Sequence, residues 1–151
     1  MTEAASLTAH TGYWLRMVSN AVSQEFARQV ADEGVTVAEW SFMRTLYDDE
    51  DGLAPSALAA RMGMTRGAIS KLADRLIDKK LVARTDSLED KRAHSLSLTD
   101  AGRAKVPVLA SLADQNDDAF FGVLTTEEHA TLLRILQALA DRRGMKTTPV
   151  D

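Results

Sequence analysis

The chain has 151 residues, of which 45% are apolar and 26% are charged, and its formal net charge is -4. This size and composition fit one globular domain with its own core and exclude a disordered or collagen-like chain. The absence of cysteine excludes disulfides, thiolate zinc sites and thiol redox switches. No apolar run is long enough to span a membrane, and residues 1–10 lack the basic start and apolar stretch of a secretory signal. We therefore expect a cytoplasmic protein without membrane contact.

Helical spacing of apolar residues dominates the N-terminal part of the chain. Between residues 7 and 30 these residues recur three or four positions apart, which predicts a first helix. Thr36 followed by Glu39 is the pattern of a capping box, in which a hydroxyl and a carboxylate accept hydrogen bonds from free backbone amides. A second helix is therefore predicted to start at this pair and to end at the polar residues 48–52.

Two shorter helices are predicted next. The first covers residues 56–62, between Pro55 at its start and Gly63 at its end, which are the usual positions of these two residue types. The second runs over residues 65–80 and is capped by Thr65.

The apolar period changes from helical to two after the fourth predicted helix. Residues 81–85 and 93–98 alternate between the two faces of a strand, which predicts a pair of short strands. Residues 86–92 are too polar to be core and are predicted to form the loop of a hairpin.

Two further helices complete the chain. Thr99 caps a long helix over residues 100–121, in which Pro107 lies beyond the first turn and predicts a kink or a tight first segment. A last helix starts at a second capping box at Thr125 and stops at Gly144.

Three helices followed by a hairpin over residues 36–98 describe a winged helix-turn-helix, whose third helix enters the major groove of DNA. The long flanking helices offer more apolar surface than this small unit can cover, so we expect a second subunit to cover it. The predicted fold is mainly α with a small β-hairpin wing and with N- and C-terminal dimerisation helices.

Within one integrated domain, the predicted segments are the N-terminal dimerisation helix (1–35), the winged helix-turn-helix DNA-binding region (36–99), the C-terminal dimerisation helices (100–145) and a tail (146–151).

The distribution of charge supports a DNA-binding region. Nine basic and five acidic residues lie between Arg61 and Arg92, a net charge of +4, whereas the rest of the chain has nine basic and 17 acidic residues, a net charge of -8. The protein is acidic as a whole but basic where it would meet phosphate.

One face of the predicted third helix carries the groups that DNA binding needs. Arg66 and Ser70 offer donors for base edges near the start of the helix, and Lys71 and Arg75 offer cations for phosphates farther along. Gly67 either lets the helix approach DNA closely or is a glycine tolerated near a helix start. Lys71 and Arg75 alone would suit an ordinary solvated face, and the hairpin downstream favours the DNA-binding interpretation.

Three sequence runs in this region resemble the multiple antibiotic resistance regulator (MarR) family. They are SALAARMGMTRGAISKLADRL from Ser56, KLVAR from Lys80, and DKRAHSLSLTDAG from Asp90. The resemblance implies a homodimer that binds a pseudo-palindromic operator in double-stranded DNA, with Arg92 entering the minor groove and Asp90 holding it. The candidate DNA-binding residues are Ser56, Thr65, Arg66, Gly67, Ser70, Lys71, Arg75, Arg84, Asp90, Lys91 and Arg92.

The resemblance also implies a repressor that releases DNA when a small aromatic or anionic molecule binds beside the dimer helices. Aromatic rings with one or two cations suit a planar anion. The candidate effector-pocket residues are His10, Tyr13, Trp14, Arg16, Trp40 and Arg44. The alternative for the tryptophans is a role as core or interface anchors, and for the arginines a role in surface pairs. Because the chain lacks cysteine, thiol-based peroxide sensors of the family are not suitable comparisons.

Nothing in the sequence predicts an enzyme, a metal site or a cofactor. His10, His94 and His129 lack ligand spacing, and residues 48–51 lack the pattern of a calcium loop. Two alternative functions are a constitutive winged-helix regulator without an effector and a winged-helix protein-interaction module. The module is disfavoured because it would not need cations at all four of the positions Arg66, Lys71, Arg75 and Arg92.

Overall fold

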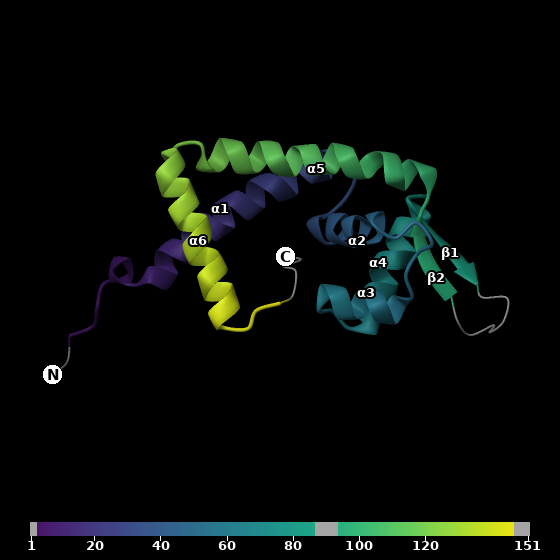
Figure 1. The fold of residues 1–151 in the computed structure, drawn as a ribbon, viewed down its shortest axis with the longest axis horizontal. Coiled ribbons are helices and arrows are strands. Elements are labelled where there is room, and N and C mark those ends of the chain that lie inside the picture. Colours follow the sequence, from purple (N-terminus) through teal and green to yellow (C-terminus); the bar gives the residue numbers. More distant parts are fainter. Residues whose placement is uncertain (1–2, 87–93, 147–151) are drawn as a thin grey trace.

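The computed structural model describes residues 3–86 and 94–146. Helices α2, α3 and α4 cluster with the β1–β2 hairpin at one end of the molecule, α5 spans its length beside α1, and α6 lies at the opposite end (Figure 1). This arrangement confirms the predicted fold class, mainly helical with a two-stranded wing. The elements in chain order are the 3-10 helix η1 (Leu7–Ala9), α1 (Thr11–Asp32), α2 (Val37–Tyr47), α3 (Pro55–Met62), α4 (Arg66–Asp78), β1 (Val82–Asp86), β2 (His94–Leu98), α5 (Asp100–Phe121) and α6 (Thr126–Arg142).

Side-chain caps start the helices at the predicted positions. The Thr36 hydroxyl accepts a hydrogen bond from the Glu39 N–H at 3.1 Å, and Oε1 of Glu39 accepts one from the Thr36 N–H at 2.8 Å. Thr125 and Glu128 form the same capping box before α6. Gly63, with φ of 64°, ends α3 in the left-handed conformation that a glycine adopts without steric cost.

Two helix ends differ from the prediction. The first helix does not begin near Leu7, because His10 has an extended backbone that separates η1 from α1. Helix α4 ends at Asp78, and Lys80 follows in the left-handed region with φ of 62°. Helix α5 continues through Pro107 as one helix.

The β-hairpin is antiparallel and is joined by a third short segment. Val82 pairs with Leu98 at its base, so β1 begins one residue later than predicted. Leu53, between α2 and α3, forms a bridge with Leu96, with backbone hydrogen bonds of 2.9 and 2.8 Å. This bridge, which the sequence did not predict, ties the wing to the helical part.

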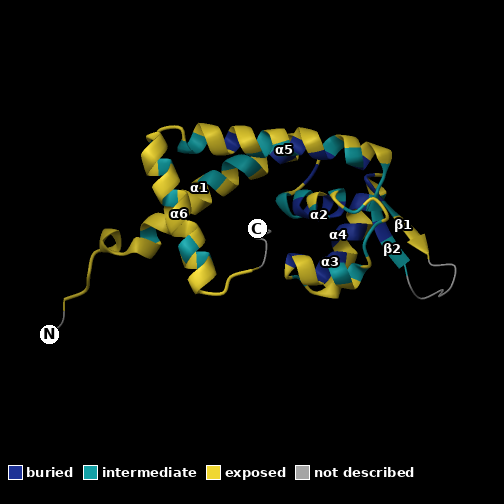
Figure 2. Cartoon of the chain, viewed as in Figure 1, coloured by how far each residue is buried: buried dark blue, intermediate teal, exposed yellow. Residues whose placement is uncertain are grey.

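The hydrophobic core lies between the hairpin and helices α2, α3, α4 and α5 (Figure 2). Its largest fully buried apolar side chains are Phe42, Met43, Leu46, Leu58, Met62, Ile69, Leu76, Leu96 and Leu109. By contrast, Val30 is the one buried residue of α1, and α6 has none, although the structure describes both helices completely. The two ends of the molecule therefore differ in how far one chain can bury its own apolar surface.

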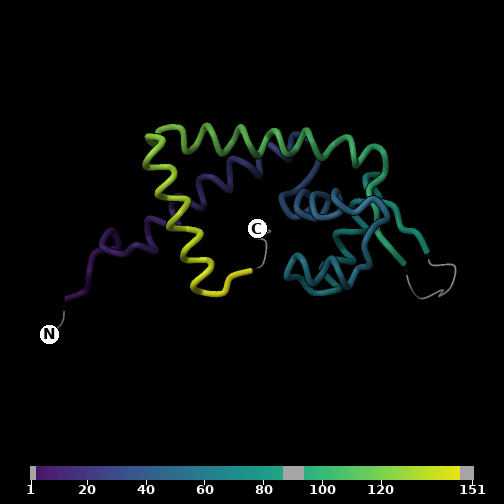
Figure 3. The backbone as a smooth tube through the Cα atoms, viewed as in Figure 1, coloured from purple at the N-terminus to yellow at the C-terminus, as the bar shows by residue number. Residues whose placement is uncertain are grey.

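Helix α5 connects these two ends. It leads from the hairpin back across the molecule, and at its far end the chain turns downward into α6 (Figure 3). Val106 and Leu109 in its first half are buried in the core, and farther along Nδ2 of Asn116 donates to the Val22 carbonyl of α1 at 3.3 Å. Within residues 3–86 and 94–146, no helix is long and apolar enough to cross a membrane.

Candidate nucleic-acid interface

Helix α4 has one face in the core and one face in solvent. Thr65 caps it by accepting a hydrogen bond from the Ala68 N–H at 3.1 Å. Ile69, Leu72 and Leu76, which follow one another at helical spacing, are buried. Burial of this face fixes which side chains point outward.

The outward face of α4 presents the predicted DNA-binding residues to solvent. Every predicted DNA-binding residue that the structure describes is exposed, also Ser56 and Arg84, which lie on α3 and β1. The exposed set is Ser56, Thr65, Arg66, Gly67, Ser70, Lys71, Arg75 and Arg84. A Cβ on Gly67 would contact nothing closer than the Thr65 hydroxyl at 4.0 Å, so packing within the chain does not require a glycine there. The space beside Gly67 therefore stays open for a molecule approaching α4.

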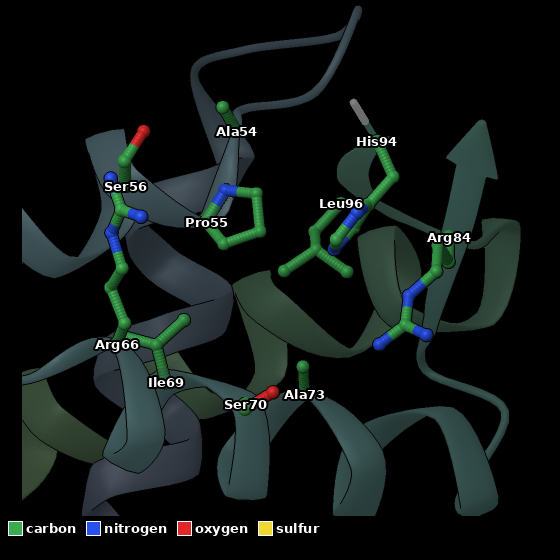
Figure 4. A pocket seen from close by; sticks show the side chains of 10 residues that line it. All are labelled: Ala54, Pro55, Ser56, Arg66, Ile69, Ser70, Ala73, Arg84, His94 and Leu96. Carbon is green, nitrogen blue, oxygen red and sulfur yellow. The ribbon is translucent and has the colours of Figure 1, made fainter. Parts of the chain in front are cut away.

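A cavity of about 370 Å³ is lined by residues of α4, of the start of α3 and of the wing. Arg66 and Arg84 stand on opposite sides of it, with Pro55 and Leu96 between them (Figure 4). Its lining residues are Ala54, Pro55, Ser56, Arg66, Ile69, Ser70, Ala73, Arg84, His94 and Leu96. Four candidates that lie far apart in the sequence, Ser56, Arg66, Ser70 and Arg84, are thus brought together.

His94 lines the same cavity, although the sequence did not single it out as a binding residue. It is the first residue of β2 and is half-buried. The signal that could have indicated it is its position at the start of the second predicted strand, one residue after Ala93, next to a loop of predicted DNA contacts. An imidazole at this place adds a hydrogen-bonding group to a site otherwise built from arginines and hydroxyls.

Ion pairs divide the basic residues of this region into two sets. Arg61 pairs with Asp49 at 2.9 Å, and Arg84 lies 3.7 Å from Asp74. Among residues 3–86 and 94–146, Arg66, Lys71 and Arg75 form no ion pair, so their charges are available to an anion such as phosphate.

Three candidates, Asp90, Lys91 and Arg92, lie outside the described residues. Their proposed roles at the wing tip and in the minor groove stay predictions.

Of the candidate effector residues at the N-terminal end of the chain, Trp14 lines an apolar cavity. Trp14 is half-exposed, and its indole N–H donates to the Thr8 carbonyl at 2.9 Å. Tyr13 packs edge-on against it, with ring centroids 5.5 Å apart, whereas His10 and Arg16 are exposed. The cavity beside Trp14 measures about 400 Å³, and its lining residues are Thr11, Trp14, Leu15, Val18, Phe120, Phe121, Val123, Leu124 and Leu132.

The two candidates on α2 do not line that cavity. Trp40 packs against the hydrophobic core. Arg44 donates to Asp48 at 3.1 Å and lies over the Tyr47 ring at 5.5 Å. One chain therefore does not bring the six candidates together at this cavity, and the α2 pair has the packing and surface roles that were the alternatives for these residue types.

Metal-ligating side chains do not gather in the part of the chain that the structure describes. Residues 3–86 and 94–146 contain no cluster of three or more histidine, aspartate or glutamate side chains that could hold a metal ion.

Three helices, a hairpin bridged to them, and an exposed helix face whose cations form no ion pair with the described residues define a winged helix-turn-helix protein. The sequence profile of the MarR family matches residues 33–93. A putative transcriptional regulatory protein for the hcr operon of Thauera aromatica is 30% identical over 135 residues, which cover 89% of this chain and 81% of that protein. The chain belongs to the MarR family.

Two further comparisons agree with this assignment. The HTH-type transcriptional repressor MdtR of Bacillus subtilis is 29% identical, over 93% of this chain and 90% of the relative. The crystal structure of a MepR–DNA complex from S. aureus shares the fold with a TM-score of 0.76 at 24% identity, over 88% of this chain and 98% of that chain. The protein is accordingly a DNA-binding transcriptional regulator and not an enzyme.

Proposed function

We propose that the protein is a homodimeric repressor that binds a pseudo-palindromic operator and is released by a small aromatic or anionic ligand. The observation that carries the dimer is the state of α6, whose 17 residues, all described, include none that is buried. An isolated helix of this length is marginal in water and depends on packing of its apolar face. A second copy of the chain supplies that packing.

The exposed apolar residues extend from α6 to α1, which supports a single large interface. The exposed large apolar side chains on these two helices are Trp14, Leu15, Met17, Val18, Leu133, Ile135, Leu136 and Leu139. Soluble monomers rarely leave so many neighbouring apolar side chains uncovered. In the proposed dimer the segments 1–35 and 100–145 form the interface, and residues 36–99 of each subunit bind one half of the operator.

Operator binding follows from the two copies of α4. In a symmetric dimer they would enter successive major grooves about 34 Å apart, the length of one DNA turn. Arg66 and Ser70 would face base edges, Lys71 and Arg75 would face phosphates, and Arg92 would enter the minor groove beside them. The name of the relative MdtR, a transcriptional repressor, supports repression as the sign of regulation.

Ligand release is proposed from the residues of α1 and the neighbouring cavity. The apolar cavity beside Trp14 has room for a small ring, while Arg16 on the same helix and His10 just before it offer cationic and polar groups for an acid. Trp40 and Arg44 would join such a site only through the partner subunit. A ligand that binds only a dimer conformation whose α4 helices do not match the groove spacing would lower the population of the conformation that binds DNA.

The test measures the mass of the protein in solution, its affinity for DNA, and its response to a panel of aromatic acids. Light scattering after size exclusion should give the mass of a dimer, and a duplex selected from a random pool should bind with a strong salt dependence. The variant Arg92→Ala should weaken binding and reduce the salt slope. A monomer, or an unchanged slope for Arg92→Ala, would contradict the proposal. If aromatic acids neither raise the Tm nor release the duplex, the constitutive regulator is the better description.

A further inference from the structure

The turn between α1 and α2 is held by lysines from two other helices. Lys105 of α5 donates to the Glu33 carbonyl at 2.9 Å and to Oε2 of Glu33 at 3.1 Å. Lys79, the residue that caps the C-terminal end of α4, donates to the Gly34 carbonyl at 2.8 Å. Two consecutive carbonyls of one turn therefore connect α5 with the end of α4.

Glu39 adds a second fixed point for Lys79. Its side chain is fully buried, and Oε1 accepts hydrogen bonds from Nζ of Lys79 at 2.9 Å and from the Thr36 N–H at 2.8 Å. A buried carboxylate depends on such partners, because removing one leaves a charge that water cannot reach. Lys79 is thus tied to the turn and to the first turn of α2 at once.

We infer that Lys79 and Glu39 are positioning residues that fix the angle of α4 against the α1–α2 turn and, through Lys105, against α5. The inference rests on the proposed homodimer, since only in a dimer does this angle set the distance between two α4 helices. With 13 residues, α4 is about 20 Å long, so a rotation of about 10° at Lys79 displaces its other end by about 3 Å. That displacement is close to the rise of one base pair, about 3.4 Å.

A simpler role for Lys79 is that of a cation near the DNA backbone. A comparison with Lys80 distinguishes this electrostatic role from the positioning role. Lys80 lies at the same end of α4, carries the same charge and is exposed. Among the described residues its side chain forms neither a hydrogen bond nor an ion pair. A purely electrostatic effect should therefore be shared by both lysines, whereas a positioning effect belongs to Lys79 alone.

The experiment measures which operator spacing each variant prefers. A duplex selected by the wild-type dimer is altered at its centre by adding or removing one or two base pairs, and binding is measured by fluorescence anisotropy. For Lys79→Met and Glu39→Gln, the preference for the original spacing should fall at least about fivefold or the optimum should move by one base pair. Lys80→Met should weaken binding evenly at all spacings, and Lys79→Arg should restore the original optimum.

The outcomes distinguish this inference from the proposed dimer. An unchanged spacing preference in Lys79→Met and Glu39→Gln, with a wild-type dimer of normal mass, overturns the positioning role and leaves the dimer intact. A monomeric wild type contradicts the dimer instead. If Lys79→Met does not fold, Glu39→Gln decides the question, because glutamine keeps the side-chain shape and the cap on Thr36 while removing the charge.

Discussion

Gly102 approaches the carbonyl oxygen of Leu81 so closely that a Cβ on the glycine would lie 2.0 Å from that oxygen. The contact joins the first turn of α5 to the residue that precedes β1. The Thr99 N–H donates to the same carbonyl at 3.1 Å, and the Thr99 hydroxyl donates to the Lys80 carbonyl at 2.7 Å. The junction between the wing and the long helix is therefore built from backbone contacts that leave no room for a side chain at Gly102.

Replacing Gly102 should destabilise the fold strongly. In Gly102→Ala the new methyl group collides with backbone, which cannot rotate away as a side chain would, and the expected cost is about 3 kcal/mol. Urea unfolding at one fixed protein concentration measures it. Gly12→Ala is the matched control, because Gly12 also lies in a first helical turn but has no atom within 4 Å of its Cβ position. Equal stability of the two variants would contradict the contact.

Replacing Gly67 should separate stability from DNA binding. Its Cβ position is open, so Gly67→Ala should leave the fold unchanged or stabilise it by up to about 1 kcal/mol through helix propensity. If α4 approaches DNA closely, the methyl group should cost binding about 1 kcal/mol or more, similar to one lost base contact. Thermal unfolding measures the change in stability, and fluorescence anisotropy with the selected duplex measures the change in DNA affinity. A raised Tm with unchanged affinity would show that the glycine is simply tolerated.

The exposed cations of α4 should determine part of the salt dependence. Lys71→Ala should lower the slope of log K against log salt concentration by about 1, and the double variant with Arg75→Ala by about 2. Arg28→Ala is the control, since Arg28 is an exposed cation on α1 that pairs with Glu25. A slope for Lys71→Ala equal to that of the wild type would place its ammonium group away from phosphate.

Local signals in the sequence predicted much of the fold. Capping boxes and a terminal glycine depend on residues within a few positions, so the starts of α2 and α6 and the end of α3 at Gly63 were predicted correctly. The limits of the hairpin and of the first helix were less exact. The break at His10 depends on one residue's backbone angles, and the helical spacing of apolar residues does not report it.

Long-range contacts account for what was missed. Glu39 was interpreted only as a cap, and Lys79 only as one of nine basic residues, because nothing in the sequence joins positions 40 residues apart. The same limit explains why His94 was not placed with Arg66 at one cavity. Conversely, Trp14 and Trp40 looked alike by residue type, but the structure leaves one half-exposed beside α6 and packs the other against the core.

The surroundings of Glu39 have opposing effects on its acidity. Burial alone would raise the pKa of this carboxyl, but hydrogen bonds from Lys79 and from the Thr36 N–H, with the charge of Lys79, lower the pKa below its ordinary value of 4.5. Its second oxygen, Oε2, has no hydrogen-bond partner among the described residues. An amide at this position would remove the negative charge that Lys79 pairs with.

Glu39→Gln should therefore reduce stability in a pH-dependent way. Because the folded-state pKa is below the unfolded one, the ionised carboxylate stabilises the fold fully above about pH 4.5, and this contribution is lost as the pH falls through the folded pKa. The free energy of unfolding of Glu39→Gln should be lower than that of the wild type by about 2 kcal/mol at pH 7, and the difference should shrink toward pH 3. Urea unfolding across this range measures it, with Glu25→Gln, which affects an exposed pair, expected to differ by no more than about 0.5 kcal/mol at pH 7. A difference that grows on acidification would mean that the carboxyl is neutral in the folded protein and that Lys79 does not hold it as an ion pair.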